Sequence, residues 1–167
     1  MTDGLPEDDL GDGEGKPRRG SRLSPRHMAM NWLSRREHSQ VELRGKLAKR
    51  EVPADVIEAT IIALVADGLL SDDRFAEAFV ASRIRKGQGP VRIRMELHRR
   101  GVNDELTALH VDGAGQEWGR LAREVRHKKF GAAIPSEYKE KARQMRFLEY
   151  RGFSGAHIRA ALGDDFD

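Results

Sequence analysis

The sequence has no cysteine among its 167 residues, and only 6% of them are aromatic. Without cysteine the chain can form no disulfide, zinc ribbon, iron–sulfur cluster or thiol nucleophile, so any metal site would use His, Asp and Glu alone. Long apolar runs are also missing: the longest, residues 56–70, contains two acidic residues and is shorter than the roughly 20 residues that span a bilayer. The acidic start of the chain is unlike a signal peptide. We therefore expect a cytoplasmic protein with no membrane contact.

Catalytic motifs are missing as well. The six histidines show no HxxxH or HExxH spacing, and the chain has neither a GxSxG sequence nor a phosphate-binding loop of the Walker A type. Asp72 and Asp73 are adjacent, so on a helix their side chains would point about 100° apart. Their place at the start of a helix explains this acidic pair better than a metal does. We expect no enzyme, no cofactor and no metal site.

Basic residues exceed acidic residues only by 30 to 27, but they are unevenly distributed. Residues 1–24 contain six acidic and four basic residues, and residues 164–167 add three aspartates. The body between these ends, residues 25–162, therefore carries a formal charge of +8. Within it, residues 83–100 have seven basic residues and one acidic, and residues 120–151 have ten and four. Such a body predicts binding to a polyanion or to an acidic protein surface.

The spacing of apolar residues after Ser24 is typical of helices, and strand-like alternation is nearly absent. Prolines stand where new apolar segments begin, as suits the first turn of a helix, and glycines stand where such segments end. Ser39 and Glu42 form the pattern of a capping box, and Asn103 is placed to cap another helix. We predict an all-α protein of about nine short helices. A disordered tail, residues 1–24, precedes them, because it holds too few apolar residues to fold.

The predicted helices repeat in groups of three. Four sets of residues align at offsets of 50 and 51: Leu47, Leu97 and Leu148; Arg50, Arg100 and Arg151; Val52, Val102 and Phe153; Ile61, Val111 and Leu162. We predict three-helix repeats over residues 25–70, 71–112 and 113–163, stacked into an elongated array. Glu51 departs from the pattern, because the two later repeats have glycine at this place. The glycine-rich stretch 107–115 predicts a loose joint between the second and third repeats.

Apolar residues occupy two roughly opposite faces of the helix predicted over residues 90–100. We therefore expect this helix to pack between two neighbours, with its arginines at the exposed edge. Glu96 is placed to pair with Arg92 and Arg100 on the same helix. Arg94 and Arg99 have no acidic residue in such a position, which makes them better candidates for contact with a partner.

A basic stripe is predicted on the helix that begins near Tyr138. Lys139, Arg143, Arg146 and Tyr150 occur at i, i+4, i+7 and i+11, and cations beside an aromatic ring suit single-stranded nucleic acid. In the segment from Gln116, Trp118 belongs to the core and three arginines face the opposite, exposed side. The contact residues that we predict are Arg83, Arg85, Lys86, Arg92, Arg94, Arg99, Arg120, Arg123, Arg126, Lys139, Arg143, Arg146 and Tyr150.

Four motifs follow one another within this threefold repeat. They are Ser34-Arg-Arg-Glu-His-Ser39 followed by Glu42-Leu43; Asp72-Asp73-Arg74-Phe75-Ala76; Gly87-Gln-Gly-Pro-Val-Arg-Ile-Arg-Met-Glu-Leu97 with Arg100-Gly101; and Arg146-Phe147-Leu148 with Arg151-Gly-Phe-Ser154. In this order, and over about residues 28–162, the sequence resembles the RecX family, bacterial regulators of the RecA recombinase. The resemblance implies three tandem three-helix repeats that lie in the groove of the RecA filament on single-stranded DNA. It also implies that the protein blocks filament extension and depresses ATP hydrolysis, strand exchange and coprotease activity.

The expected partners are therefore the RecA filament and single-stranded DNA, the latter bound weakly and without sequence preference by a monomer. An alternative is a direct DNA-binding protein, because three-helix units with a basic helix resemble tandem helix-turn-helix modules. In that case Arg92, Arg94 and Arg99 would contact base edges. The third helices predicted in the first two repeats carry almost no basic residues, which argues against recognition helices there. A protein-only adaptor unrelated to recombination is a third alternative, and it leaves the four ordered motifs unexplained.

Overall fold

The computed structural model of the protein describes residues 23–163, which form nine α-helices and no strand. The helices are α1 (Pro25–Leu33), α2 (Gln40–Lys49), α3 (Ala54–Ala66), α4 (Asp72–Arg85), α5 (Pro90–Arg99), α6 (Asp104–Asp112), α7 (Trp118–Phe130), α8 (Tyr138–Tyr150) and α9 (Gly155–Leu162). The all-α fold that the apolar spacing predicts is confirmed. The predicted tail lies outside the described residues except for its last two, and the acidic end, residues 164–167, lies outside them entirely.

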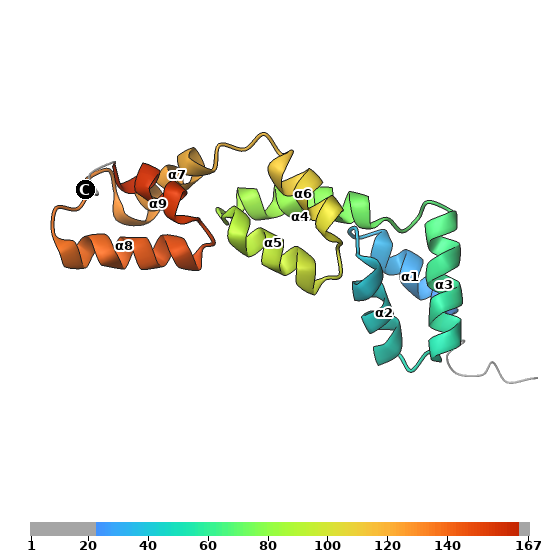
Figure 1. The fold of residues 1–167 in the computed structure, drawn as a ribbon. Helices are drawn as coiled ribbons and strands as arrows, with labels where there is room; N and C mark the ends of the chain where they lie inside the picture. Colours follow the sequence, from blue (N-terminus) through green and yellow to red (C-terminus); the bar gives the residue numbers. More distant parts are fainter. Residues whose placement is uncertain (1–22, 164–167) are drawn as a thin grey trace, which may run out of the picture.

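The helices form three units that follow one another along the chain (Figure 1), namely the first unit (α1–α3), the second unit (α4–α6) and the third unit (α7–α9). Each unit has its own small apolar core. The three aligned leucines, Leu47, Leu97 and Leu148, lie at the centres of these cores with no exposed surface. The repeat that the sequence predicts is therefore a repeat of core positions, as in other arrays built from small helical units.

Side-chain caps begin the helices where the sequence predicts them. The Ser39 hydroxyl accepts a hydrogen bond from the Glu42 N–H at 3.1 Å, and the Asn103 side chain accepts one from the Leu106 N–H at 2.8 Å. Each of these bonds satisfies a backbone donor that has no partner within its helix. Only half of the predicted capping box forms at Ser39, because the Glu42 carboxylate bonds to arginines instead.

The first joint is the contact of residues 36–42 with the second unit. The Gln40 N–H, at the start of α2, donates to the Asp72 carboxylate at 2.8 Å. The Glu42 carboxylate accepts a hydrogen bond from the Arg100 guanidinium, at the end of α5, at 3.0 Å. The start of the second helix in one unit thus lies against the turn that ends the second helix in the next.

The second joint is the contact of residues 84–92 with the third unit, and it brings together the corresponding segments one unit further along. The Gly89 N–H donates to the Arg151 carbonyl at 2.8 Å, and the Val91 N–H donates to the Gly152 carbonyl at 2.9 Å. Both bonds join backbone to backbone between segments about 60 residues apart in the sequence. The start of α5 is thus bonded to the turn that ends α8.

The prediction of a loose second joint is wrong. Besides the two backbone bonds, Ile84 and Trp118 each pack against the cores of both the second and the third unit. The glycine-rich stretch 107–115 does not weaken this contact, because the joint is made by other segments. Trp118 is half-buried at this boundary, in agreement with its predicted place in the core.

The turn that follows the second helix of each unit needs a left-handed residue. Gly101 and Gly152 have φ values of 75° and 97°, and a Cβ on either would overlap a side chain of the preceding unit, Val41 or Arg92. Glu51 has the same backbone conformation in the first unit, with φ 61°. No earlier unit packs against Glu51 in the described part of the chain, so its side chain meets no such obstacle. The departure of Glu51 from the repeat thus has a structural reason.

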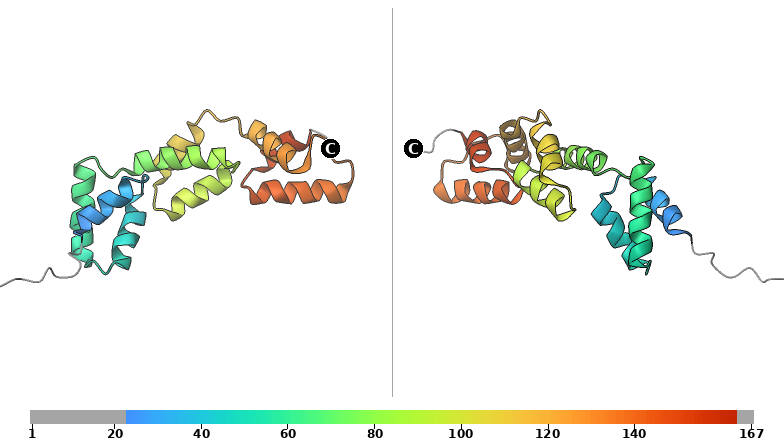
Figure 2. Two further views of the ribbon diagram at one scale, coloured as in Figure 1. Left: turned by 180° about the vertical axis from the view of Figure 1, so that it is seen from behind. Right: turned by 45° about the vertical axis from the view of Figure 1, so that its right-hand side comes forward.

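The array is elongated and bent. Figures 1 and 2 show the three units in a row, with the N-terminal end of the described chain at one extremity and the C-terminal end at the other. Helices α4 and α8 run roughly along the array, whereas α3 runs across it, so the direction changes near the first joint. In the part of the chain that the structure describes, no helix is both long enough and apolar enough to cross a membrane.

These turns predict opposite effects for two substitutions. Glu51→Gly should raise the free energy of unfolding by about 0.5–1 kcal/mol, because glycine removes the left-handed strain but adds freedom to the unfolded chain. Gly152→Ala should lower it by about 2 kcal/mol or more, because it adds both strain and an overlap at the second joint. Urea unfolding followed by circular dichroism measures both changes. A Gly152→Ala variant as stable as the parent would contradict the close approach.

His38 gives the protein a predicted sensitivity to acid. The ring is buried before α2, where Nδ1 bonds to the Arg36 carbonyl at 3.0 Å and Nε2 accepts from the Lys46 ammonium at 2.9 Å. Burial lowers the pKa of His38 below 6.5, and the cationic side chains of Arg36 and Lys46 add to the effect. The unfolded state therefore binds the proton more readily. Stability should be complete above about pH 6.5 and should fall as the pH drops below it.

Urea midpoints at pH 7.5 and pH 5.5 test this dependence. The loss between the two pH values should be smaller in His38→Gln than in the parent. His157→Gln is the comparison variant, because burial also lowers the pKa of His157 but this residue lies in the third unit. If His38→Gln keeps the full loss and His157→Gln removes it, the first unit does not carry the acid sensitivity.

Candidate functional site

Five cationic side chains line a groove at the second joint. This basic groove has a volume of about 380 Å³ and lies between the end of α4, one side of α7 and the end of α8. Its apolar floor includes Leu121 and Val125. Its cationic lining residues are Arg85, Lys86, Lys128, Lys129 and Arg151.

Local helix chemistry explains why these cations converge. Arg85 stands in the last turn of α4 with Lys86 at its C-cap, while Lys128 and Lys129 stand in the last turn of α7. Cations are favoured at C-terminal ends, where backbone carbonyls carry partial negative charge. The Arg151 guanidinium donates to the Lys86 carbonyl at 3.0 Å and so holds the two units together across the groove.

Two aromatic rings in contact connect the basic groove with the stripe on α8. Phe130 and Phe147 pack edge to face at 5.2 Å between centroids. Lys129 and Arg151 lie over the Phe147 ring, at 5.9 and 5.3 Å, and Arg143 of the stripe lies over the Phe130 ring at 5.4 Å. The rings and cations therefore form one continuous surface at the third unit, with contacts of the cation–π type.

The basic stripe on α8 is exposed, as its spacing predicts. Lys139, Arg143, Arg146 and Tyr150 all point to solvent. Arg143 also bonds to Glu140 at 3.2 Å, and hydrogen bonds from Gln144 and Arg143 lower the pKa of the Glu140 carboxyl. Lys139 and Arg146 have no ion pair among residues 23–163, which leaves both charges available to a partner.

The corresponding groove at the first joint, the middle groove, shows what sets the basic groove apart. It is lined by Arg36, Arg83 and Arg100 among others, but each of these cations has an acidic partner. Glu42 bonds to Arg36 at 2.8 Å and to Arg100 at 3.0 Å, and Glu96 pairs with Arg83 at 3.1 Å. Apart from Lys86, which lines both grooves, the cations of the middle groove are therefore compensated internally.

The basic groove has no such compensation. Its only acidic lining residue is Glu124, which pairs with Arg120 on the same helix at 3.3 Å. By the repeat offset of 50, Arg92 takes the place that Glu42 has in the first joint. Arg92 instead pairs with Glu96 and lies over the ring of Tyr150. One exchange of charge sign thus leaves the second joint cationic.

The prediction that Arg126 lies on the exposed side of its helix is wrong. The residue is 4% exposed, and its guanidinium donates to the carbonyls of Ala132 and Ala133 and to the Gln144 side chain at 3.2–3.4 Å. These bonds satisfy carbonyls in the connection between α7 and α8, where the chain has no helix. Arg126 stabilises this connection and is not available to a partner.

Three further predicted contact residues are engaged within the protein. Arg83 pairs with Glu96 and lies over the Phe79 ring at 4.5 Å, and Arg92 is half-buried beside the same carboxylate. Arg94, expected to be free of acidic neighbours, forms an ion pair with Asp112 of α6. The prediction that a second apolar face of α5 is packed against a neighbour is also wrong, because Val91 and Met95 are about half exposed.

The remaining predicted residues lie on the surface, although not all on one face. Arg85 and Lys86 belong to the basic groove, and Arg120 and Arg123 lie on the exposed side of α7. Among residues 23–163, the Arg99 side chain forms a hydrogen bond only with the Met95 sulfur. Sequence reasoning missed three members of the basic groove, Lys128, Lys129 and Arg151. The excess of basic residues over 120–151 is the signal that could have found them. In the part of the chain that the structure describes, no three metal-ligating side chains cluster together.

Arg126 and Arg123 form a matched pair that tests the corrected assignment. Arg126→Ala should lower the free energy of unfolding by about 2–4 kcal/mol, because it removes charged hydrogen bonds and buried side-chain packing together. Arg123→Ala, on the exposed side of the same helix, should change it by about 0.5 kcal/mol or less. Urea unfolding measures both changes. Equal, small effects would mean that the Arg126 side chain is not held in the interior.

Comparison with known proteins gives the same division into three units. Family models for the first, second and third three-helix domains of RecX match residues 26–64, 71–108 and 120–162. Two proteins named regulatory protein RecX, from Halorhodospira halophila and Pseudomonas savastanoi pv. phaseolicola, are each 44% identical to the chain. The matches cover 81% and 86% of this chain and 84% and 95% of those proteins.

Solved structures show the same fold at lower identity. A crystal structure of regulatory protein RecX superposes with a TM-score of 0.69 at 19% identity, over 84% of this chain and 72% of that one. The crystal structure of RecX from Lactobacillus salivarius gives a TM-score of 0.64 at 21% identity, over 82% and 91% of the two chains. With three domain models matched in order over most of its length, the chain belongs to the RecX family of regulatory proteins.

Proposed function

We propose that this protein regulates the RecA recombinase by binding the RecA filament on single-stranded DNA. In this proposal it blocks filament extension and thereby depresses ATP hydrolysis, strand exchange and coprotease activity. Membership of the RecX family is the observation that carries the proposal. The protein acts as a monomer and binds single-stranded DNA only weakly and without sequence preference.

The charge of the third unit supports a contact with a polyanion or an acidic protein surface. The basic groove and the stripe on α8 are joined through Phe130 and Phe147, and few of their cations have acidic partners. Field lines from an uncompensated cationic surface raise the rate of encounter with negatively charged partners. The elongated array adds reach along a filament, because contacts can be distributed over successive units.

Thermodynamic linkage sets a condition on how such a regulator can act on filament assembly. A regulator shifts filament assembly only by the difference between its affinities for the states that it meets. Binding that spans neighbouring RecA subunits or caps a filament end can act below one copy per subunit, because extension depends on the end. A protein that only coats DNA has no such advantage.

The ATPase activity of the cognate RecA on single-stranded DNA tests the proposal. Titration with this protein should inhibit ATP hydrolysis at ratios too low to coat the DNA, while its own affinity for the same DNA, measured in parallel, stays weak. Inhibition that begins only when the DNA is saturated would contradict the proposal and favour the direct DNA-binding alternative. A sequence-preference assay would then follow.

The stripe on α8 should contribute to this inhibition. Changing Lys139, Arg143 and Arg146 to alanine should raise the half-inhibiting concentration about tenfold, if each exposed charge contributes about 0.5 kcal/mol. The matched control changes three exposed, ion-paired cations of the first and second units, Arg26, Arg44 and Arg94, to alanine. Circular dichroism confirms that both variants keep their helices. Equal potency of the stripe variant and the parent would remove α8 from the interface.

The basic groove should contribute to the salt dependence of DNA binding. Changing Lys128 and Lys129 to alanine should lower the slope of log affinity against log salt by about 1.4, since each phosphate contact on a single strand contributes about 0.7. Fluorescence anisotropy of a labelled oligothymidine over a salt series measures the slope. An unchanged slope would show that the groove lysines do not contact phosphates.

A further inference from the structure

The first unit has a groove of the same origin as the middle groove and the basic groove. In each unit it lies between the first helix and the end of the second helix. Corresponding positions of the first helices, each three residues after a fully buried alanine, line the three grooves: Trp32, Phe79 and Val125. The turns that end the second helices contribute the aligned Arg50, Arg100 and Arg151. The groove of the first unit, the end groove, is the largest of the three at about 620 Å³.

The middle groove and the basic groove are each filled at one side by the preceding unit. In the middle groove the Glu42 carboxylate accepts a hydrogen bond from Arg100 at 3.0 Å. In the basic groove the Lys86 carbonyl accepts one from Arg151, also at 3.0 Å. The arginine at this place thus receives an oxygen acceptor from upstream in the chain in both units.

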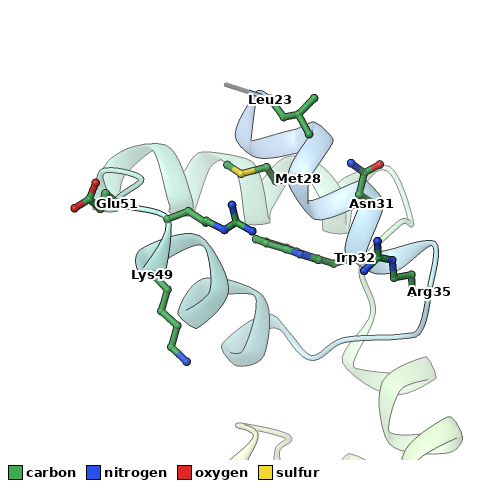
Figure 3. Close-up of a pocket in the computed structure, with 8 residues that line it drawn as sticks. Leu23, Met28, Asn31, Trp32, Arg35, Lys49 and Glu51 are labelled. Carbon is green, nitrogen blue, oxygen red and sulfur yellow. The ribbon is translucent and has the colours of Figure 1, made fainter. Parts of the chain in front are cut away.

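No preceding unit fills the end groove in the part of the chain that the structure describes. Figure 3 shows Trp32 at the centre of this groove, with Met28 above it, Arg35 near one end of the ring and Glu51 beyond the other. Arg35 and Arg50 are exposed and have no ion pair among residues 23–163. Leu23, the first described residue, lines the same groove, so the chain upstream of it begins where a preceding unit would lie.

A second copy of the protein cannot dock there as one unit docks on the next. Both joints need a glycine after the arginine, because a Cβ at Gly101 or Gly152 would overlap the preceding unit. The end groove has Glu51 at this place, with a full side chain on a left-handed backbone. Head-to-tail stacking in the geometry of the joints is therefore blocked. The occupant must be a slimmer segment that carries oxygen acceptors.

The chain supplies such a segment directly upstream. Residues 1–14 contain six acidic residues and no basic residue. Residues 15–22, four of which are basic, connect them to Leu23 and, fully extended, span at most about 28 Å, which is enough to turn back over the adjacent groove. The end of α4, which lines the basic groove, lies at the side of the second unit that faces away from the first unit (Figure 1). The negative charge of segment 1–14 and its short connection to Leu23 together favour the end groove.

We propose that the acidic segment 1–14 docks in the end groove and places carboxylates on Arg35 and Arg50. There it fills the place that Glu42 fills in the middle groove. In this arrangement its carboxylates neutralise the two arginines of the end groove, and the basic groove remains the uncompensated cationic site. The proposal does not depend on the function proposed above, because it concerns a contact within one chain.

A spin label on the acidic segment tests the contact. Since the chain has no cysteine, Asp9→Cys carries a nitroxide at a single site. Amide resonances of residues 28–35 and 48–52 should broaden, and the broadening should be lost in Arg35→Glu/Arg50→Glu. It should also be lost on going from 0.1 M to 1 M salt, which shortens the screening length from about 10 to about 3 Å. Lys139→Glu, an exposed cation of the third unit, is the matched control and should leave the broadening unchanged.

Three results would overturn the proposal. Broadening spread evenly over the three units would mean that the segment has no fixed place. Broadening centred on residues 84–87 and 128–130 would assign it to the basic groove. Concentration-dependent association in sedimentation, removed by Arg50→Glu, would identify a second copy as the occupant.

Affinity for DNA gives an independent readout of the masking. Changing the six acidic residues of segment 1–14 to their amides should tighten binding to oligothymidine at low salt. The same change in an Arg35→Gln/Arg50→Gln background should give a smaller gain, because the cations that the segment masks are gone. An equal gain in both backgrounds would reflect net charge alone and would overturn the masking.

Discussion

The array depends, at each joint, on the close approach of the start of one second helix to the turn that ends the next second helix. A helix N-terminus leaves N–H groups without partners within the helix, and a helix C-terminus leaves carbonyls. At the second joint these unpaired donors and acceptors bond to each other: the N–H groups of Gly89 and Val91 donate to the carbonyls of Arg151 and Gly152. The approach is possible only where glycine follows the arginine. One residue type therefore supplies both the left-handed turn and the clearance that stacking needs.

The charge pattern follows from how the joints reuse this geometry. The first joint carries Glu42 where the second carries Arg92, so an acid neutralises two arginines in one case, whereas in the other Arg92 pairs with Glu96 of its own helix and no acid reaches Arg151 in the described part of the chain. The second joint tolerates a cation at this position because its contact is made by backbone groups, whereas the first joint uses the Glu42 carboxylate itself. The scaffold can thus keep its shape while its grooves differ: one compensated, one cationic and one open at the end of the array.

The sequence predicts the features of this fold that arise within about one helical turn or recur at the repeat offset. The helix class, the caps at Ser39 and Asn103 and the core leucines all belong to this group, because spacing alone determines them. The exposed stripe on α8 could be predicted for the same reason. The joints could not, since they bring together backbone groups about 60 residues apart. A helical wheel likewise could not place Arg126, because the carbonyls that draw it inward lie in a connection whose path is not periodic.

The same distinction explains why single arginines were assigned less well than charged stretches. Whether an arginine is free depends on an acid that can be distant in sequence, as Asp112 is for Arg94. The summed charge of a stretch is less sensitive to such pairing, so the excess over residues 120–151 indicates a cationic region even though Arg126 is buried within it. At each joint the groove is built from two units, and its net charge is the sum of their contributions. The second joint keeps a large positive charge because both helix ends that line its groove carry cations and neither carries an acid.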